Sequence, residues 1–323
     1  MNREENKKWL IDCIEDNKEV FCEASKAIWS NPELAMQERF AVETLTGLLE
    51  NSGFRVEKGV AGMPTAFVAE YGEGRPVIGF SAEFDALPGL SQKNDSNFHD
   101  PVKEGAPGHG CGHNLLSIGG VQAAVALKKL MEEKDIKGTI RLFGTPAEEI
   151  CVGKPFMAKA GLFEGLDAVV DWHPAHTNTS GYRDCLAYFN IKYHFKGKAA
   201  HGNAPWRGVS ALDSAMLMAH AIEIMREHVD PGSKEAPTTI NYAFPDCGNA
   251  YPVVVPDRAD IWIVGRFNSA ALLKDVLEKV RKAAEGCALA TGTTVEEEFT
   301  TATHNMIPNK TISEDIYENF QIV

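Results

Sequence analysis

The sequence predicts an α/β protein, a three-layer α/β sandwich that carries an inserted ferredoxin-like βαββαβ unit. Over residues 1–185, helical and strand patterns alternate, which is typical of helices packed on a mostly parallel sheet. From residue 186, apolar and polar residues alternate, which indicates a sheet with one solvent-facing side. The chain has 323 residues, 44% of them hydrophobic, enough for one large domain or two of ordinary size.

The first 185 residues are expected to form the first part of a metal-binding catalytic domain. Two helices are predicted in the first fifty residues, and Asn31-Pro32 followed by Glu33 marks the start of the second. Asn114 is the predicted N-cap of a long apolar helix. The remaining elements are expected as strands over 65–71 and 76–84, a helix over 115–131, a strand over 139–144, a helix near 154–163 and a buried strand at DAVVDW, 167–172.

Residues 186–302 are expected to form the inserted domain. In AYFNIKYHFKGK, the apolar residues Phe189, Ile191, Tyr193 and Phe195 occupy every second position. The elements that follow are expected as a helix over 210–228, strands over 238–244 and 258–267, a helix over 270–290 and a strand over 293–301. The order βαββαβ is that of the ferredoxin-like unit. Residues 303–323 begin an amphipathic helix, the expected start of a return to the first domain that is cut short.

Charge and cysteine content narrow the class of protein. The formal net charge of −13, from 45 acidic and 32 basic side chains, repels phosphate backbones and anionic lipids, so no nucleic-acid or membrane partner is expected. The N-terminal residues lack the apolar core of a signal peptide, and we expect a cytoplasmic protein. Seven scattered cysteines do not form the disulfide framework of a small secreted scaffold.

The segment GHGCGHN, residues 108–114, is the first candidate site. In an extended segment, His109, Cys111 and His113 point the same way, because side chains repeat with a period of two. Thiolate and imidazole suit zinc or a similar transition metal, and the predicted helix start favours the thiolate of Cys111. Two alternatives stay open: a glycine turn with incidental histidines, and a Cys111 nucleophile with His113 as its base.

Two further segments follow strand ends, where open α/β sheets place their sites. In GTPAEEI, the adjacent Glu148 and Glu149 project differently, so one can bind metal while the other takes a proton from water. In DWHPAH, His173 follows a strand and precedes Pro174. Glutamate pairs are common on solvated surfaces and lone histidines are commonly structural, but three such groups at successive element boundaries favour one metal site.

Four other residues are weaker candidates. Asp85 in AEFDALPGL can orient a ligating imidazole or form an ordinary turn. His201 is a loop histidine that could stabilise an oxyanion. Arg207 and Arg266 are candidates for binding a substrate carboxylate, or are surface charges.

The motifs AEFDALPGL, GHGCGHNLL, GTPAEE, DWHP and AAHGNAPWRGVSALD, in this order, resemble the metal-dependent aminoacylase and amidohydrolase branch of the zinc carboxypeptidase-like peptidases. The resemblance implies a dimer with a lid/dimerisation domain and a site for two divalent metal ions, Zn or Mn. It implies hydrolysis of an N-acyl amino acid or dipeptide, such as an aminobenzoyl-glutamate-like substrate. The implied ligands are Cys111, His113, Glu149 and His173, with Glu148 as general base, Asp85 as its helper carboxylate and His201 acting from the lid.

The sequence departs from the family pattern in three places. Val253 and Trp206 stand where many members have Asn and His, which puts substrate contacts in doubt. Members also supply one more His ligand near their C-terminus, and this sequence ends at Val323 before that position. The chain is therefore expected to be a fragment, or to work with fewer protein ligands. A catalytically incomplete binding or scaffold protein remains the alternative of another class.

Overall fold

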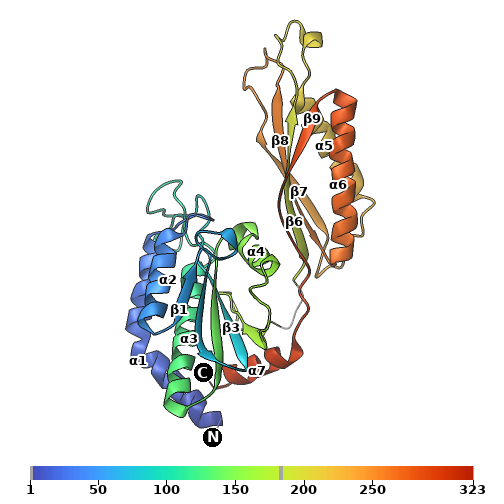
Figure 1. The fold of residues 1–323 in the computed structure, drawn as a ribbon. Helices are drawn as coiled ribbons and strands as arrows, with labels where there is room; N and C mark the ends of the chain where they lie inside the picture. The colour runs from blue at the N-terminus through green and yellow to red at the C-terminus, as the bar shows by residue number, and fades with distance from the viewer. Residues whose placement is uncertain (1–2, 182–184, 323) are drawn as a thin grey trace. The chain divides into compact units, whose positions relative to one another are not determined.

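The computed structural model describes residues 3–181 and 185–322, which divide into two compact units, Met1–Thr177 and Asn178–Val323 (Figure 1). Each unit has its own sheet, helices and hydrophobic core. The predicted α/β class is confirmed. No helix in the described part of the chain is long and apolar enough to span a membrane.

The first unit is built on a five-stranded sheet with the order β1-β2-β4-β3-β5. Its strands are β1 (Arg55–Lys58), β2 (Phe67–Glu73), β3 (Val77–Glu83), β4 (Gly138–Thr145) and β5 (Ala168–Val170). The expectation of a mostly parallel sheet is confirmed in strand direction, since β1, β3, β4 and β5 run the same way and only β2 is reversed. Strand β2 therefore pairs antiparallel with β1 and with β4, whereas β3 pairs parallel with β4 and with β5. Parallel pairing needs a crossover, and helices supply one only after β3 and after β4.

Helices cover both faces of this sheet, so the three-layer prediction is confirmed (Figure 1). Helices α1 (Arg3–Ser30), α2 (Arg39–Asn51) and α3 (His113–Lys134) share one core with the sheet, and α4 (Gly153–Lys159) packs in a second core. Leu142 and Phe143 are neighbours on β4 that are both fully buried, one in each core. Successive strand residues point to opposite faces, so β4 is covered on both sides.

Three local expectations for this unit are corrected. The second helix begins at Arg39 and not after Pro32, because the Glu33 carboxylate accepts hydrogen bonds from the backbone N–H groups of Phe40 and Ala41 and so caps it from upstream. Strand β1 was not expected at all. Strand β5 is an edge strand that is only partly buried, although its apolar run predicted a buried one.

Asn114 is not the N-cap of α3. Gly112, with φ of +77°, precedes the helix, and His113 is its first residue. The Asn114 side chain instead donates to the hydroxyl of Ser25 on α1 at 3.1 Å. A polar residue near a helix start therefore joins two helices here and does not cap one.

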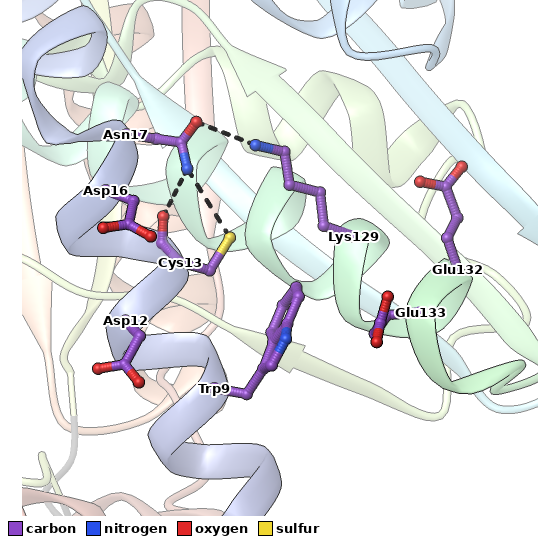
Figure 2. A pocket seen from close by; sticks show the side chains of 8 residues that line it. All are labelled: Trp9, Asp12, Cys13, Asp16, Asn17, Lys129, Glu132 and Glu133. Atoms are coloured by element: carbon purple, nitrogen blue, oxygen red, sulfur yellow. Dashed lines mark hydrogen bonds between the residues drawn. The ribbon is translucent and has the colours of Figure 1, made fainter.

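Helices α1 and α3 are also joined at a cavity of about 480 Å³, shown in Figure 2. Lys129 on α3 donates to the side-chain oxygen of Asn17 at 3.0 Å, and Asn17 donates to the carbonyl of Cys13 at 2.6 Å. Four carboxylates and an indole complete the lining: Asp12, Asp16, Glu132, Glu133 and Trp9. The Lys129–Asn17 hydrogen bond joins α1 to α3, the helix that begins at His113.

The second unit has a four-stranded antiparallel sheet with the order β7-β8-β6-β9. Its elements are β6 (Ala187–Lys196), α5 (Ala211–Arg226), β7 (Thr239–Asp246), β8 (Arg258–Phe267), α6 (Ala270–Thr291) and β9 (Thr294–Thr303). The predicted βαββαβ order is confirmed, and the strand order is that of a ferredoxin-like sheet. A short helix, α7 (Lys310–Phe320), follows, with Asn309 accepting from the N–H of Ile312 as its N-cap.

The alternating apolar residues of β6 face a hydrophobic core, as predicted. Phe189, Ile191, Tyr193 and Phe195 are at most 2% exposed and pack with α5 and α6. On the opposite face His194 lies between two carboxylates, with Nδ1 2.8 Å from Asp260 and Nε2 3.1 Å from Glu298. One face of the sheet is a hydrophobic core and the other is charged.

Candidate metal and catalytic site

The glycines of GHGCGHN let the chain pass close to its neighbours and turn into α3. A Cβ on Gly108 would lie 2.0 Å from the carbonyl oxygen of Leu90, so this position excludes any side chain. Gly112 takes the left-handed conformation that glycine adopts without steric cost. The turn leaves Cys111 partly buried and makes His113 the first, fully buried residue of α3.

His113 is the centre of the site. Its Nδ1 lies 3.0 Å from the carbonyl oxygen of Asp85 and 3.1 Å from the Asp85 carboxylate. Its Nε2 lies 3.3 Å from the Glu83 carboxylate. Burial lowers the pKa of His113, but the hydrogen bond and charge of Asp85, with the charge of Glu83, outweigh it and raise the pKa to about 9. In the metal-free chain, therefore, a positive imidazole offsets buried carboxylates.

Cys111 and His173 complete one group of potential ligands. The Cys111 Sγ is 3.4 Å from His173 Nε2, and the ligand atoms of Cys111, His113 and His173 all lie within 4.8 Å of one another. Three residues separated by up to 62 positions in sequence thus meet at the end of the sheet. The sequence predicted this convergence from strand ends and helix starts.

The protonation of Cys111 differs from the expectation. Burial, followed by the charges of Glu149 and Glu148, raises the pKa of the Cys111 thiol to about 12 in the metal-free chain, so the helix start does not produce a thiolate. A thiol with a raised pKa is a poor nucleophile. The raised pKa disfavours the alternative of a Cys111 thiol amidase and is compatible with a thiol that ionises on binding a cation.

Glu148 and Glu149 lie on a tight turn after β4, the 3-10 helix Glu148–Ile150. The turn is flanked by Ala147 and Cys151, with φ of +56° and +54°, a conformation that costs free energy in residues with a Cβ. The N–H of Glu149 donates to the second carboxylate oxygen of Asp85 at 3.0 Å. Asp85 therefore contacts both His113 and the glutamate turn, and these are the contacts that an orienting carboxylate would make.

The two glutamates face different partners. A Glu148 oxygen lies 3.7 Å from His113 Nε2, and Glu148, Glu83 and His113 form a second group with ligand atoms within 4.8 Å. The Glu149 side chain hydrogen-bonds to Cys111. Burial is the largest cause that raises the pKa of both carboxyl groups, and the charge of His113 opposes it.

The sequence analysis missed two residues of this cluster, Glu83 and Lys154. Glu83 ends β3 two positions before Asp85, so a period of two could have placed both on one side. The Lys154 ammonium forms an ion pair with Glu83 and lies 3.3 Å from Asp171. Burial lowers the pKa of Lys154, but Asp171 and Glu83 outweigh it and raise the pKa above its ordinary value. Lys154 follows the glutamate turn in sequence, and nothing else in the sequence indicates that it lies in this cluster.

The other three candidates lie in the second unit. His201 is exposed, and its Nδ1 accepts a hydrogen bond from the N–H of Asn203 at 3.2 Å. Arg207 is exposed at the end of a short 3-10 helix, Pro205–Arg207. The Arg266 guanidinium stacks on the Tyr188 ring at 5.3 Å. The structure brings the ligand candidates of the first unit together and describes these three residues within their own unit.

The chemistry of the donor set fits a divalent transition metal. Within residues 3–181 and 185–322, the buried atoms without a hydrogen-bond partner include His113 Nε2, Glu149 Oε1 and Glu83 Oε2. Buried polar groups are nearly always paired. His113 Nε2 and Glu83 Oε2 lie 3.3 Å apart, and a cation bound by these atoms would satisfy both. Cys, His and carboxylate ligands are those of zinc and related metals.

These features define the class of protein: a two-unit α/β protein with a Cys/His/carboxylate cluster at the end of its first sheet.

Residues 79–307 match the sequence profile described as peptidase family M20/M25/M40, and the chain belongs to this family. One of the subunits of the p-aminobenzoyl-glutamate hydrolase of Escherichia coli K12 is 36% identical over 96% of this chain and 64% of its own length. The Xaa-Arg dipeptidase of Mus musculus is 32% identical over 97% of this chain and 70% of its own.

Solved structures show the same fold. An aminobenzoyl-glutamate utilization protein from Klebsiella pneumoniae has a TM-score of 0.71 at 17% identity, covering 94% of this chain and 81% of its own. A dinuclear metal-binding M20 peptidase from Bacillus subtilis has a TM-score of 0.58 at 20% identity, with the same two coverages. The family resemblance and the fold class expected from the sequence are therefore confirmed.

Proposed function

We propose that this protein contributes to metal-dependent hydrolysis of an amide bond in an N-acyl amino acid or dipeptide. The observation that carries the proposal is the convergence of Cys111, His113 and His173, with ligand atoms within 4.8 Å, beside the carboxylate of Glu148. The relatives support the reaction class, since they include hydrolases of p-aminobenzoyl-glutamate and hippurate, and an N-acetylcysteine deacetylase.

In the proposed site, Cys111, His113, Glu149 and His173 would hold two divalent ions, Zn or Mn. When bound, the ions supply Lewis-acid polarisation of the scissile carbonyl and lower the pKa of water. Glu148 takes a proton from the attacking water and delivers it to the leaving amine. Asp85 fixes the ring of His113 through Nδ1 and leaves Nε2 facing the site.

The second unit is proposed as the lid, with residues 186–302 inserted between residues 1–185 and the segment that starts at 303. His201 is proposed to donate a hydrogen bond to the oxyanion of the tetrahedral intermediate. Arg207 or Arg266 would bind the substrate carboxylate, because a guanidinium matches its two oxygens. A cytoplasmic location agrees with the formal net charge of −13 and is part of the same proposal.

Metal content tests the proposal directly. The purified chain is expected to carry one to two divalent ions, and both Cys111→Ser and Glu149→Ala should lose metal together with hydrolysis of N-acyl-glutamate compounds. Elemental analysis and amine release are measured on the same samples. Lys129→Ala, which removes a hydrogen bond between α1 and α3, is the control that should retain metal. Wild-type protein that binds no added Zn²⁺ or Mn²⁺ contradicts the proposal.

A homodimer through the second unit is the proposed assembly. On α5, Met216, Leu217 and Ile224 are 40–58% exposed. They lie on one side of the helix, because Ile224 follows Met216 and Leu217 by eight and seven positions, about two turns. Exposed apolar groups of this kind mark association surfaces. In analytical sedimentation, the wild-type chain is expected to be a dimer and the Ile224→Asp variant a monomer. Because two relatives are named as different subunits of one hydrolase, a monomer that pairs only with a related chain would contradict the homodimer.

A further inference from the structure

Glu38 is a buried carboxylate, far in sequence from the candidate site, whose two oxygens both accept hydrogen bonds. It lies just before α2 and is 0% exposed. Its Oε1 accepts the N–H of Ala147 at 2.9 Å, and its Oε2 accepts the hydroxyl of Thr65 at 2.8 Å. Burying a charged group is costly, so a carboxylate kept here needs a role that an apolar side chain could not fill.

The backbone partner of Glu38 is Ala147, the residue just before the glutamate turn. Ala147 is fully buried and takes the left-handed conformation at φ of +56°, which is unfavourable for a residue with a Cβ. Such conformations persist where surrounding contacts over-determine them. Two residues later, the N–H of Glu149 is bound by Asp85. The turn is thus held at two backbone points by two buried carboxylates from different parts of the chain.

We infer that Glu38 is a positioning residue that, together with Asp85, clamps the backbone on both sides of Glu148 and so sets the directions of Glu148 and Glu149. Glu38 touches neither side chain; it acts through the N–H of Ala147. Without it, that N–H is buried and unpaired and the strained residue loses its support. The turn then relaxes, and the Glu149 carboxylate moves away from Cys111. The inference deepens the proposed function and rests on it for the role of the two glutamates.

The experiment compares Glu38→Ala with three other variants of the same chain. Glu38→Gln keeps an acceptor for Ala147 and a donor for Thr65. Glu38→Ala with Ala147→Gly removes the steric cost of the left-handed residue, because glycine adopts it freely. Glu33→Ala is the matched control, since the Glu33 carboxylate also accepts two backbone N–H groups but caps α2 and does not contact the turn.

Two measurements are made on each variant: the dissociation constant for Zn²⁺ by competition with a chelator, and hydrogen exchange of the peptide spanning residues 145–152. Glu38→Ala is expected to weaken Zn²⁺ binding by about 10–100-fold, the range for outer-shell partners of metal ligands, and to speed exchange. Glu38→Gln should stay within a few-fold of wild type, the double variant should recover part of the affinity, and Glu33→Ala should change neither quantity.

The outcomes separate this inference from the proposed function. If Glu38→Ala matches Glu33→Ala in both measurements, the positioning role is wrong while metal binding stands. If the wild-type chain binds no Zn²⁺, the proposed function fails, and hydrogen exchange alone tests whether Glu38 holds the turn. Faster exchange in Glu38→Ala that is slowed again by Ala147→Gly supports this role. Unchanged exchange in Glu38→Ala overturns it.

Discussion

Glu148→Gln is expected to lower the rate of amide hydrolysis by about 10²–10⁴-fold, the usual contribution of a general acid–base group, while leaving metal content unchanged. The substitution keeps the shape of the side chain and removes its ability to accept a proton from water. Burial already raises the pKa of Glu148, which places the group closer to the pH at which a base works best. The measurements are kcat for N-acyl-glutamate hydrolysis and metal per chain.

Glu149→Gln is the neighbouring comparison, because it is the proposed ligand on the same turn. It should lose metal as well as activity, whereas Glu148→Gln should lose activity alone. Glu148 also belongs to the group of potential ligands with Glu83 and His113, so the two measurements together assign the roles of the two glutamates. A Glu148→Gln chain that loses metal, beside a Glu149→Gln chain that retains it, would reverse the two roles.

The fold was predictable where pattern and period decide the structure. In β6 the apolar positions alternate over a whole strand, and the same four residues belong to the core of the second unit. The sheet of the first unit was less predictable, because strand direction depends on which strands pair. Strand β1 has four residues, three of them charged, and its partner β2 lies beyond a short 3-10 turn, so no hydrophobic period marks it.

The candidate ligands were predictable because their residue types and their positions at the ends of elements both indicate metal binding. Cys111, His113 and His173 are of the types that bind transition metals, and each lies at an element boundary. Their supporting residues were not predictable in the same way. Glu38 and Lys154 reach the cluster through tertiary contacts, 109 residues away in one case and 71 in the other, and glutamate and lysine are the residue types most common on surfaces.

His113→Ala is expected to lower the free energy of unfolding of the metal-free chain by about 3–5 kcal/mol, the cost of removing one partner from a buried charged group. His113 is fully buried, with Asp85 at Nδ1 and Glu83 at Nε2. Removing the imidazole leaves these carboxylates without its positive charge. Denaturant unfolding in the presence of a chelator measures the effect. His173→Ala, an exposed residue of the same cluster, is the control and should change stability by less than about 1 kcal/mol.

The effect of His113 should also depend on pH in a direction that follows from its pKa. The folded-state pKa is raised to about 9, against an ordinary value of 6.5, so the folded chain holds the proton more tightly than the unfolded one. Its charge contribution is complete below 6.5 and is lost as pH rises through 9. The stability difference between wild type and His113→Ala should therefore shrink between these two values, and a difference that stays constant would show that packing, not charge, makes His113 stabilising.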